Sequence, residues 1–121
     1  MKTLSSIMAG LVAVEHLYIL WIEMFAWTTK GKATFTSIPP DLFEKTKVLA
    51  ANQGLYNGFL AAGLIWSLFI ADVQWSVNIA LFFLSCVIVA AVYGAFTASK
   101  SILLKQGVPA IVALLLVLLN L

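Results

Sequence analysis

Hydrophobic residues are grouped along this chain into four long blocks, which shorter polar segments separate. The blocks cover residues 4–28, 48–71, 75–97 and 102–121. A helix of about 20 apolar residues, rising 1.5 Å per residue, spans the ~30 Å hydrocarbon core of a bilayer. The pattern therefore predicts an all-α fold in which residues 1–121 form a single integral-membrane four-helix bundle.

The first two blocks are joined by a long connection, roughly residues 29–47. It contains Pro39-Pro40-Asp41, a run that suits a turn leading into a short helix over residues 42–47. The connection is amphipathic, which suits a segment lying along a membrane interface as a spacer. As the longest non-spanning segment, it is also a candidate lid over a cavity. Its apolar residues are Phe35, Ile38, Leu42 and Phe43.

Composition supports a membrane location, because 63% of the residues are hydrophobic and only 10% are charged. A soluble domain has about 25% charged residues. The formal net charge is only +2, and all the basic residues are lysines. Nucleic-acid binding is therefore not expected, and the lipid bilayer is the expected partner.

The placement of lysine predicts the orientation of the chain. Apart from Lys2, every lysine lies in or beside the first or the third connection. The positive-inside rule then places both of these connections in the cytoplasm, and the N- and C-termini outside. The first block is expected to remain uncleaved, since Glu15 and His16 interrupt the apolar core that a secretory signal needs.

Three ionisable residues, Glu15, His16 and Glu23, lie within the first block. A charge at the bilayer centre costs ~2.5–3.5 kcal/mol on insertion scales, so such residues usually have a function. His16 and Glu23 fall within about 20° of one helix face, and Glu15 is displaced by about 80–100°. This stacking suits a proton relay or a polar binding slot, with polar contacts between helices as the alternative.

A metal site is not expected within one chain, because the sequence has one histidine and one cysteine, Cys86. Only assembly across subunits could supply further ligands. The sequence also has no catalytic Ser-His-Asp arrangement, phosphate-binding glycine run or cofactor-attachment motif. Any cofactor is left open.

The second block opens with a polar run, residues 52–57, beside a stripe of small residues that favours close helix packing. The amides and phenol of this run either bond across a helix interface or orient a ligand. Further polar groups occur near the cytoplasmic ends of the last two blocks. The expected site residues are Glu15, His16, Glu23, Asn52, Gln53, Tyr56, Asn57, Tyr93 and Gln106.

At these residues the chain resembles a family of small four-span bacterial membrane proteins, domain of unknown function 1304. The resemblance implies a multi-pass protein of the bacterial inner membrane, and it implies no activity. It covers nearly the whole chain. The stretches that carry it are Glu15-His16-Leu17-Tyr18-Ile19, Glu23-Met24-Phe25-Ala26-Trp27, ANQGLYNGFLAAGL at residues 51–64, Tyr93-Gly94-Ala95 and Gln106-Gly107-Val108-Pro109-Ala110.

The layout is also similar, more distantly, to the membrane-associated eicosanoid and glutathione enzymes. Those proteins hold glutathione with arginines, which this chain lacks. Asn57 stands nearest to the place of an acidic residue in their second-span motif. The similarity therefore concerns topology rather than glutathione chemistry, and fold-level analogy is a weak guide to function.

These patterns predict a homo-oligomeric membrane protein with an intramembrane polar site for a small or amphipathic molecule. Proton-coupled transport through Glu23 or Glu15 is one possible use of such a site. The alternatives are an intramembrane enzyme acting on a quinone or a lipid, with His16 or Tyr56 as the acid–base group, and a structural membrane subunit. The sequence does not decide among them.

Overall fold

The computed structural model describes residues 1–121 and contains helices and no strands, which confirms the all-α class. Two short helices occupy the long connection that follows the first long helix. A π-helical turn leads into the last helix. The elements are α1 (Thr3–Phe25), α2 (Lys30–Thr34), α3 (Leu42–Lys45), α4 (Lys47–Phe69), α5 (Val73–Thr97), η1 (Leu103–Gly107) and α6 (Val108–Leu118).

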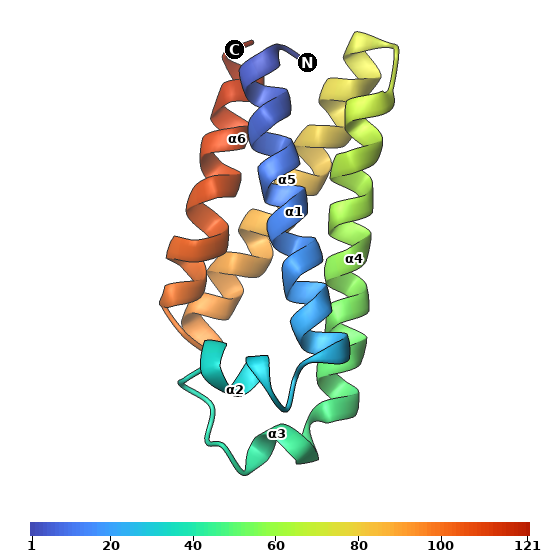
Figure 1. Ribbon diagram of the computed structural model, residues 1–121. Coiled ribbons are helices and arrows are strands. Elements are labelled where there is room, and N and C mark those ends of the chain that lie inside the picture. Colours follow the sequence, from blue (N-terminus) through green and yellow to red (C-terminus); the bar gives the residue numbers. More distant parts are fainter.

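Four long helical segments lie side by side along one axis: α1, α4, α5 and the continuous η1–α6 segment (Figure 1). Helix α1 contacts α4 over most of its length and also contacts α6. Helices α2 and α3 cover one end of this arrangement. Both termini and the turn between α4 and α5 lie at the opposite end (Figure 1).

The helix limits agree with the four predicted blocks to within a few residues. The short helix expected at residues 42–47 is present as α3, whereas α2 was not predicted. Helices α1 and α5 are long and apolar enough to cross a membrane, and Leu103–Leu118 is a shorter apolar helical stretch. Helix α4 carries several amides besides its apolar residues.

The core between the helices is built mainly from small and β-branched side chains, which lets the helices approach closely. Helix α6 contributes Ala110, Ala113 and Val117 to it, so one face of α6 is a packing wall. Helices α1 and α4 approach each other closely at Gly54. An added Cβ there would lie 3.0 Å from the Cβ of Glu23 and 3.2 Å from the carbonyl oxygen of Leu20.

The outward faces of the long helices carry large apolar side chains. Phe69 is 82% exposed and Phe96 is 88% exposed. In contrast, several polar side chains are buried between the helices: Ser5, His16, Glu23, Asn57, Ser67 and Ser76. Soluble monomers rarely leave a continuous apolar surface of this kind open to water.

The π-helical turn η1 ends two residues before Pro109, which lies in the first turn of α6. Proline has no backbone N–H, and its ring clashes with the carbonyl four residues earlier in a regular α-helix. A widened turn relieves that clash, and π-turns often occur at functional sites. The result is that Lys105 and Gln106 lie on the widened turn.

Candidate functional site

A buried hydrogen bond between α1 and α4 lies at the centre of the candidate site. Asn57 Nδ2 donates to Glu23 Oε1 at 2.6 Å, and Glu23 is only 8% exposed. The same amide group lies 3.2 Å from the carbonyl oxygen of Gln53. Gly54 permits this contact, because its missing side chain lets α4 approach the backbone of α1 beside Glu23.

His16 lies two helical turns before Glu23 on α1 and is 1% exposed. Its Nδ1 lies 2.8 Å from the carbonyl oxygen of Val12. A carbonyl oxygen only accepts hydrogen bonds, so Nδ1 carries the proton in this contact. The other ring nitrogen, Nε2, is left for a different partner.

Two neighbouring cavities open beside these residues. The larger has a volume of about 440 Å³, and its walls include Glu15, Glu23, Lys105 and Gln106. The segment from the start of α2 to the end of α3, residues 30–45, is called the α2–α3 connection below. Some of its residues form another wall, so this segment covers the cavity as a lid would. They are Thr34, Phe35, Thr36, Ser37 and Ile38.

The smaller cavity has a volume of about 220 Å³ and lies against α4 and α5. Its polar lining comes mainly from His16, Glu23 and the amides and phenol of α4. Glu23 and Gln106 line both cavities, so the two spaces are adjoining parts of one polar region.

Most of the site residues expected from sequence are brought together here. The larger cavity contains Glu15, Glu23 and Gln106, and the smaller contains His16, Glu23, Gln53, Tyr56, Asn57 and Gln106. Asn52 and Tyr93 line neither cavity. Asn52 is exposed and donates to the Val48 carbonyl at 2.9 Å, whereas Tyr93 is 71% exposed on α5. Tyrosine in such a place suits a membrane interface.

Sequence reasoning did not identify Lys105 as a site residue. Lysine was read only as a marker of the cytoplasmic side, although it directly precedes Gln106. Because η1 places both residues on one widened turn, Lys105 lines the larger cavity together with Glu15 and Glu23. The proline four positions later was the available signal.

Trp27 was also missed, because late aromatic residues in a span usually lie at a membrane interface. In the structure its ring packs against Phe35 and Phe43, at centroid distances of 5.4 and 4.8 Å. Its Nε1 donates to Thr46 Oγ1 at 3.0 Å. Trp27 therefore fixes the α2–α3 connection over the larger cavity, which it also lines.

No three His, Cys, Asp or Glu side chains lie close enough together to hold a metal ion within the chain. Cys86 is half-buried on α5 and has no disulfide partner. The chemical groups that the cavities do offer are carboxyls, one imidazole, one ammonium group, amides and a phenol. They can bind polar groups and transfer protons.

Comparison with known proteins places the chain in a family. The family described as "Protein of unknown function (DUF1304)" matches residues 10–118. The chain belongs to this family. It is also 37% identical over 117 residues to "Uncharacterized protein YpaA" of Lactococcus lactis subsp. lactis (strain IL1403), covering 95% of this chain and 97% of that protein.

No solved structure matches the chain. The family match confirms the resemblance noted from the sequence motifs. Neither the family description nor the relative's name mentions eicosanoid or glutathione metabolism, so that more distant similarity stays an expectation about layout.

Proposed function

We propose that this protein is a multi-pass protein of the bacterial inner membrane. In this proposal α1, α4, α5 and the η1–α6 segment all span the bilayer as one four-helix bundle over residues 1–121. The support comes from the large apolar side chains on the outward faces of these helices, since lipid is the solvent that such faces suit. The amides of α4 are compatible with spanning because polar side chains in membrane helices usually face the bundle interior.

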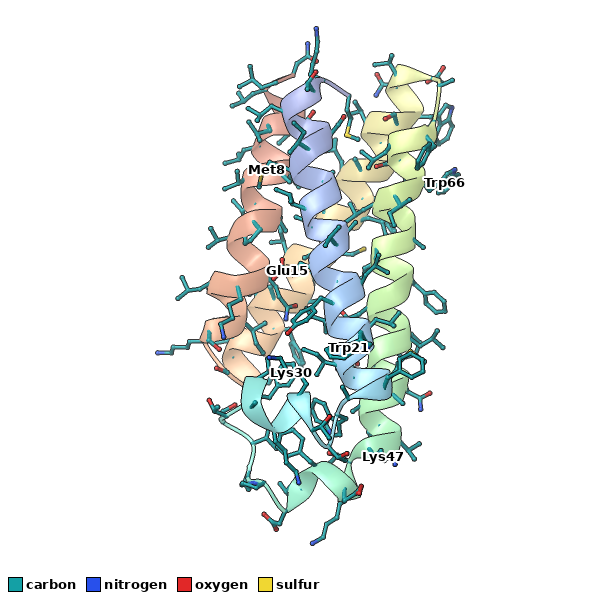
Figure 2. All side chains as sticks on the ribbon, in the orientation of Figure 1. Met8, Glu15, Trp21, Lys30, Lys47 and Trp66 are labelled. Atoms are coloured by element: carbon teal, nitrogen blue, oxygen red, sulfur yellow. The ribbon has the colours of Figure 1, made fainter.

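The orientation that we propose places both termini outside the cell. The lysines of α2, α3 and η1 lie at the end opposite the termini, and Figure 2 shows Lys30 and Lys47 there, far from Met8. A cytoplasmic location for this lysine-rich end follows the positive-inside rule. The larger cavity then opens toward the cytoplasm beneath the α2–α3 connection.

The function proposed for this region is the binding of a small amphipathic molecule. The observation that carries the proposal is the ≈ 440 Å³ cavity, which places Glu15, Glu23 and Gln106 among aromatic and aliphatic walls. Its size lies within the range of small-molecule sites, and a few polar groups among apolar walls are typical of them. Ionisable residues at membrane depth also mark substrate and proton pathways.

The residues would divide the work by their chemistry. Glu23 and His16 would take up and release protons, while the Asn57, Gln53 and Gln106 amides and the Tyr56 hydroxyl would orient the ligand. If the ligand crosses the membrane, proton coupling through Glu23 or Glu15 is the natural mechanism.

A second candidate function is an intramembrane enzyme for a lipophilic substrate. The observation that favours it is the smaller cavity, where His16 and Tyr56 line the same space and His16 Nε2 is not used by the bond to Val12. Either group can serve as a general acid or base. Conversion of a bound molecule, rather than binding alone, would separate this function from the first.

Native mass spectrometry of gently extracted protein tests the proposal. Wild type is compared with Glu23→Gln and with Glu44→Gln, a matched control because Glu44 is exposed on α3 and lines neither cavity. We expect a discrete small molecule bound to wild type and to Glu44→Gln but lost from Glu23→Gln. The same spectra report whether the protein is a homo-oligomer, as we also propose.

A protein that comes out empty in all three forms would contradict the ligand-binding function. It would favour a structural membrane subunit, in which the buried polar groups only hold the helices together.

A further inference from the structure

We propose that the larger cavity takes a lipophilic organic cation, a monovalent ammonium or phosphonium ion with a bulky apolar body. This inference rests on the proposed function, because it names the ligand class of the same site. Three features of the site carry it: the balance of acidic and basic groups, the aromatic residues, and the acceptor atoms that make no hydrogen bond within the protein.

The balance of charge in the cavity favours a cation. The charged side chains in its wall are the carboxylates of Glu15 and Glu23 and the ammonium group of Lys105. Lys105 is exposed, whereas Glu23 is buried and Glu15 is half-buried. The inner part of the cavity is therefore acidic, and the basic group lies where solvent reaches it. With both carboxyl groups ionised and Lys105 protonated, the wall carries one net negative charge, which a monovalent cation would balance and an anion would double.

The apolar wall suits the body of such an ion. The rings of Tyr18, Trp27 and Phe35 line the cavity, together with Ile19, Ile22 and Ile102. The faces of aromatic rings attract cations, and sites for quaternary ammonium groups are commonly built from them. Aliphatic and aromatic surface around a charged centre selects a bulky organic ion over a small hydrated one.

The site also leaves strong hydrogen-bonding capacity unused. Glu23 is 8% exposed, and the bond from Asn57 goes to Oε1 only, so Oε2 is available on the side that lines the cavities. His16 is 1% exposed, and its bond to Val12 uses Nδ1 only. No buried side-chain nitrogen or oxygen lacks a hydrogen-bond partner, so these two free atoms are reachable from the cavities. Acceptor atoms that face a cavity present negative partial charge to a ligand, which favours a cation over an anion.

A matched pair of probes tests the sign of the ligand's charge. Tetraphenylphosphonium and tetraphenylborate have nearly the same size and shape and opposite charge. Binding of each to the full-length protein is measured by titration calorimetry in a nonionic detergent. The variants are Glu15→Gln, Glu23→Gln and Lys105→Gln, with Glu44→Gln as the control on α3.

We expect tetraphenylphosphonium to bind, and Glu23→Gln and Glu15→Gln each to weaken its binding by about tenfold. Lys105→Gln should tighten it by a few-fold, because a like charge is removed, and Glu44→Gln should leave it unchanged. Glu15→Gln keeps the test decisive if Glu23→Gln fails to fold, since it does not disturb the bond between Glu23 and Asn57.

Two results would overturn the inference. Preferred binding of tetraphenylborate, weakened by Lys105→Gln, would assign the cavity to anions while leaving the proposed ligand-binding function intact. Equal or absent binding of both probes in all forms would exclude an organic-cation site. In that case the mass spectra decide the proposed function separately: a bound neutral or zwitterionic molecule keeps it, and an empty protein removes it.

Discussion

The hydrogen bond between Asn57 and Glu23 affects both the stability of the protein and the candidate site, because the carboxyl group of Glu23 is buried. Burying such a group costs free energy unless a donor compensates it. The 2.6 Å bond from the Asn57 amide supplies that donor from the neighbouring helix. The same bond fixes the orientation of the Glu23 side chain toward the cavities, so one contact serves both stability and the site.

Replacing Asn57 by leucine should therefore destabilise the protein more than the loss of one ordinary contact. We expect the free energy of unfolding to fall by about 2 kcal/mol, since the buried carboxyl of Glu23 keeps its desolvation cost and loses its donor. The double variant with Glu23→Leu should lose less than the sum of the single variants. Unfolding in detergent, followed by circular dichroism, measures all three values.

Asn78→Leu is the control for this cycle, because Asn78 is an exposed amide on α5. Its substitution should change the free energy of unfolding by no more than about 0.5 kcal/mol. If the changes in the free energy of unfolding at positions 23 and 57 simply added in the double variant, the bond would not couple the two helices.

Among the helices, the pairing of α1 with α4 positions the site most directly. Gly54 faces α1 at the height of Glu23, where an added Cβ would lie 2.7 Å from Met24 Cγ. Gly58 faces the Leu20 side chain one turn later. Gly54 and Gly58 of the small-residue stripe are thus covered by α1 of the same chain, so these two positions are not free for an interface between chains.

Gly54→Ala should separate α1 from α4 and weaken the protein. We expect a loss of about 1–3 kcal/mol in the free energy of unfolding, because the backbone oxygen of Leu20 cannot move away from the new methyl group without shifting the helix. Ligand affinity should fall as well, since Glu23 moves with α1. Thermal unfolding and the probe titration measure the two effects.

Gly10→Ala provides the matched control, because an added Cβ at Gly10 meets only Leu68 Cδ1, at 3.8 Å. This is an ordinary contact, and alanine favours a helix over glycine by about 0.5–1 kcal/mol. The control should therefore be neutral or slightly stabilising. Equal effects of the two substitutions would show that the α1–α4 approach is not tight at Gly54.

The α2–α3 connection covers the larger cavity because Trp27 holds it there. The indole ring contacts Phe35 and Phe43 and donates a hydrogen bond to Thr46, so one side chain joins the end of α1 to both short helices. Short helices of this kind are unstable without tertiary contacts. The position of the connection thus depends on this aromatic cluster.

Trp27→Leu should loosen the connection while leaving the long helices folded. Backbone amides of residues 30–46 should exchange with deuterium at least about tenfold faster. Local unfolding of this segment costs less free energy once the contacts of the Trp27 ring are absent. Hydrogen exchange with mass spectrometry measures this directly. Trp66→Leu, an exposed substitution on α4 at the other end of the molecule, should leave that segment unchanged (Figure 2). Faster exchange in both variants, or in neither, would remove Trp27 from this role.

The whole molecule combines an apolar outer surface, polar side chains buried between the helices, and lysines that, apart from Lys2, lie at one end. In the membrane location that we propose, each feature would have its own physical reason: lipid around the helices, polar groups that need partners, and the charge asymmetry of membrane insertion. Together they support an orientation in which the cavities adjoin the cytoplasmic side. In the proposed function, that orientation would determine from which compartment a ligand enters.

Labelling of single cysteines tests the orientation. In a Cys86→Ala background, Asn120→Cys near the C-terminus should react with a membrane-impermeant maleimide added to spheroplasts, whereas Lys45→Cys on α3 should react only after lysis. The reverse pattern would invert the topology. Labelling of both positions from outside would contradict a chain that spans the membrane an odd number of times between them.

Much of the helical framework could be predicted from sequence, because apolar blocks and turn residues act locally. The limits of α1, α4 and α5 follow the hydrophobic blocks, and Asp72 caps α5 by accepting a hydrogen bond from the Trp75 backbone N–H. Pro109 at the start of α6 is also visible in the sequence, and it was the available signal for the π-turn before it, which the sequence analysis did not predict.

Three properties could be derived from the sequence alone: the all-α class, the placement of every lysine except Lys2 near the first or third connection, and the chemical groups available for a site. Which residues line the site depended on tertiary packing, because the rotation of each helix about its axis sets which side chains meet. Asn57 points at Glu23, whereas Asn52 bonds to its own helix and Tyr93 faces outward. Lys105 and Trp27 also line the larger cavity because of tertiary packing. The residues that share this cavity with them lie far away in the sequence, so local patterns do not reveal the contact.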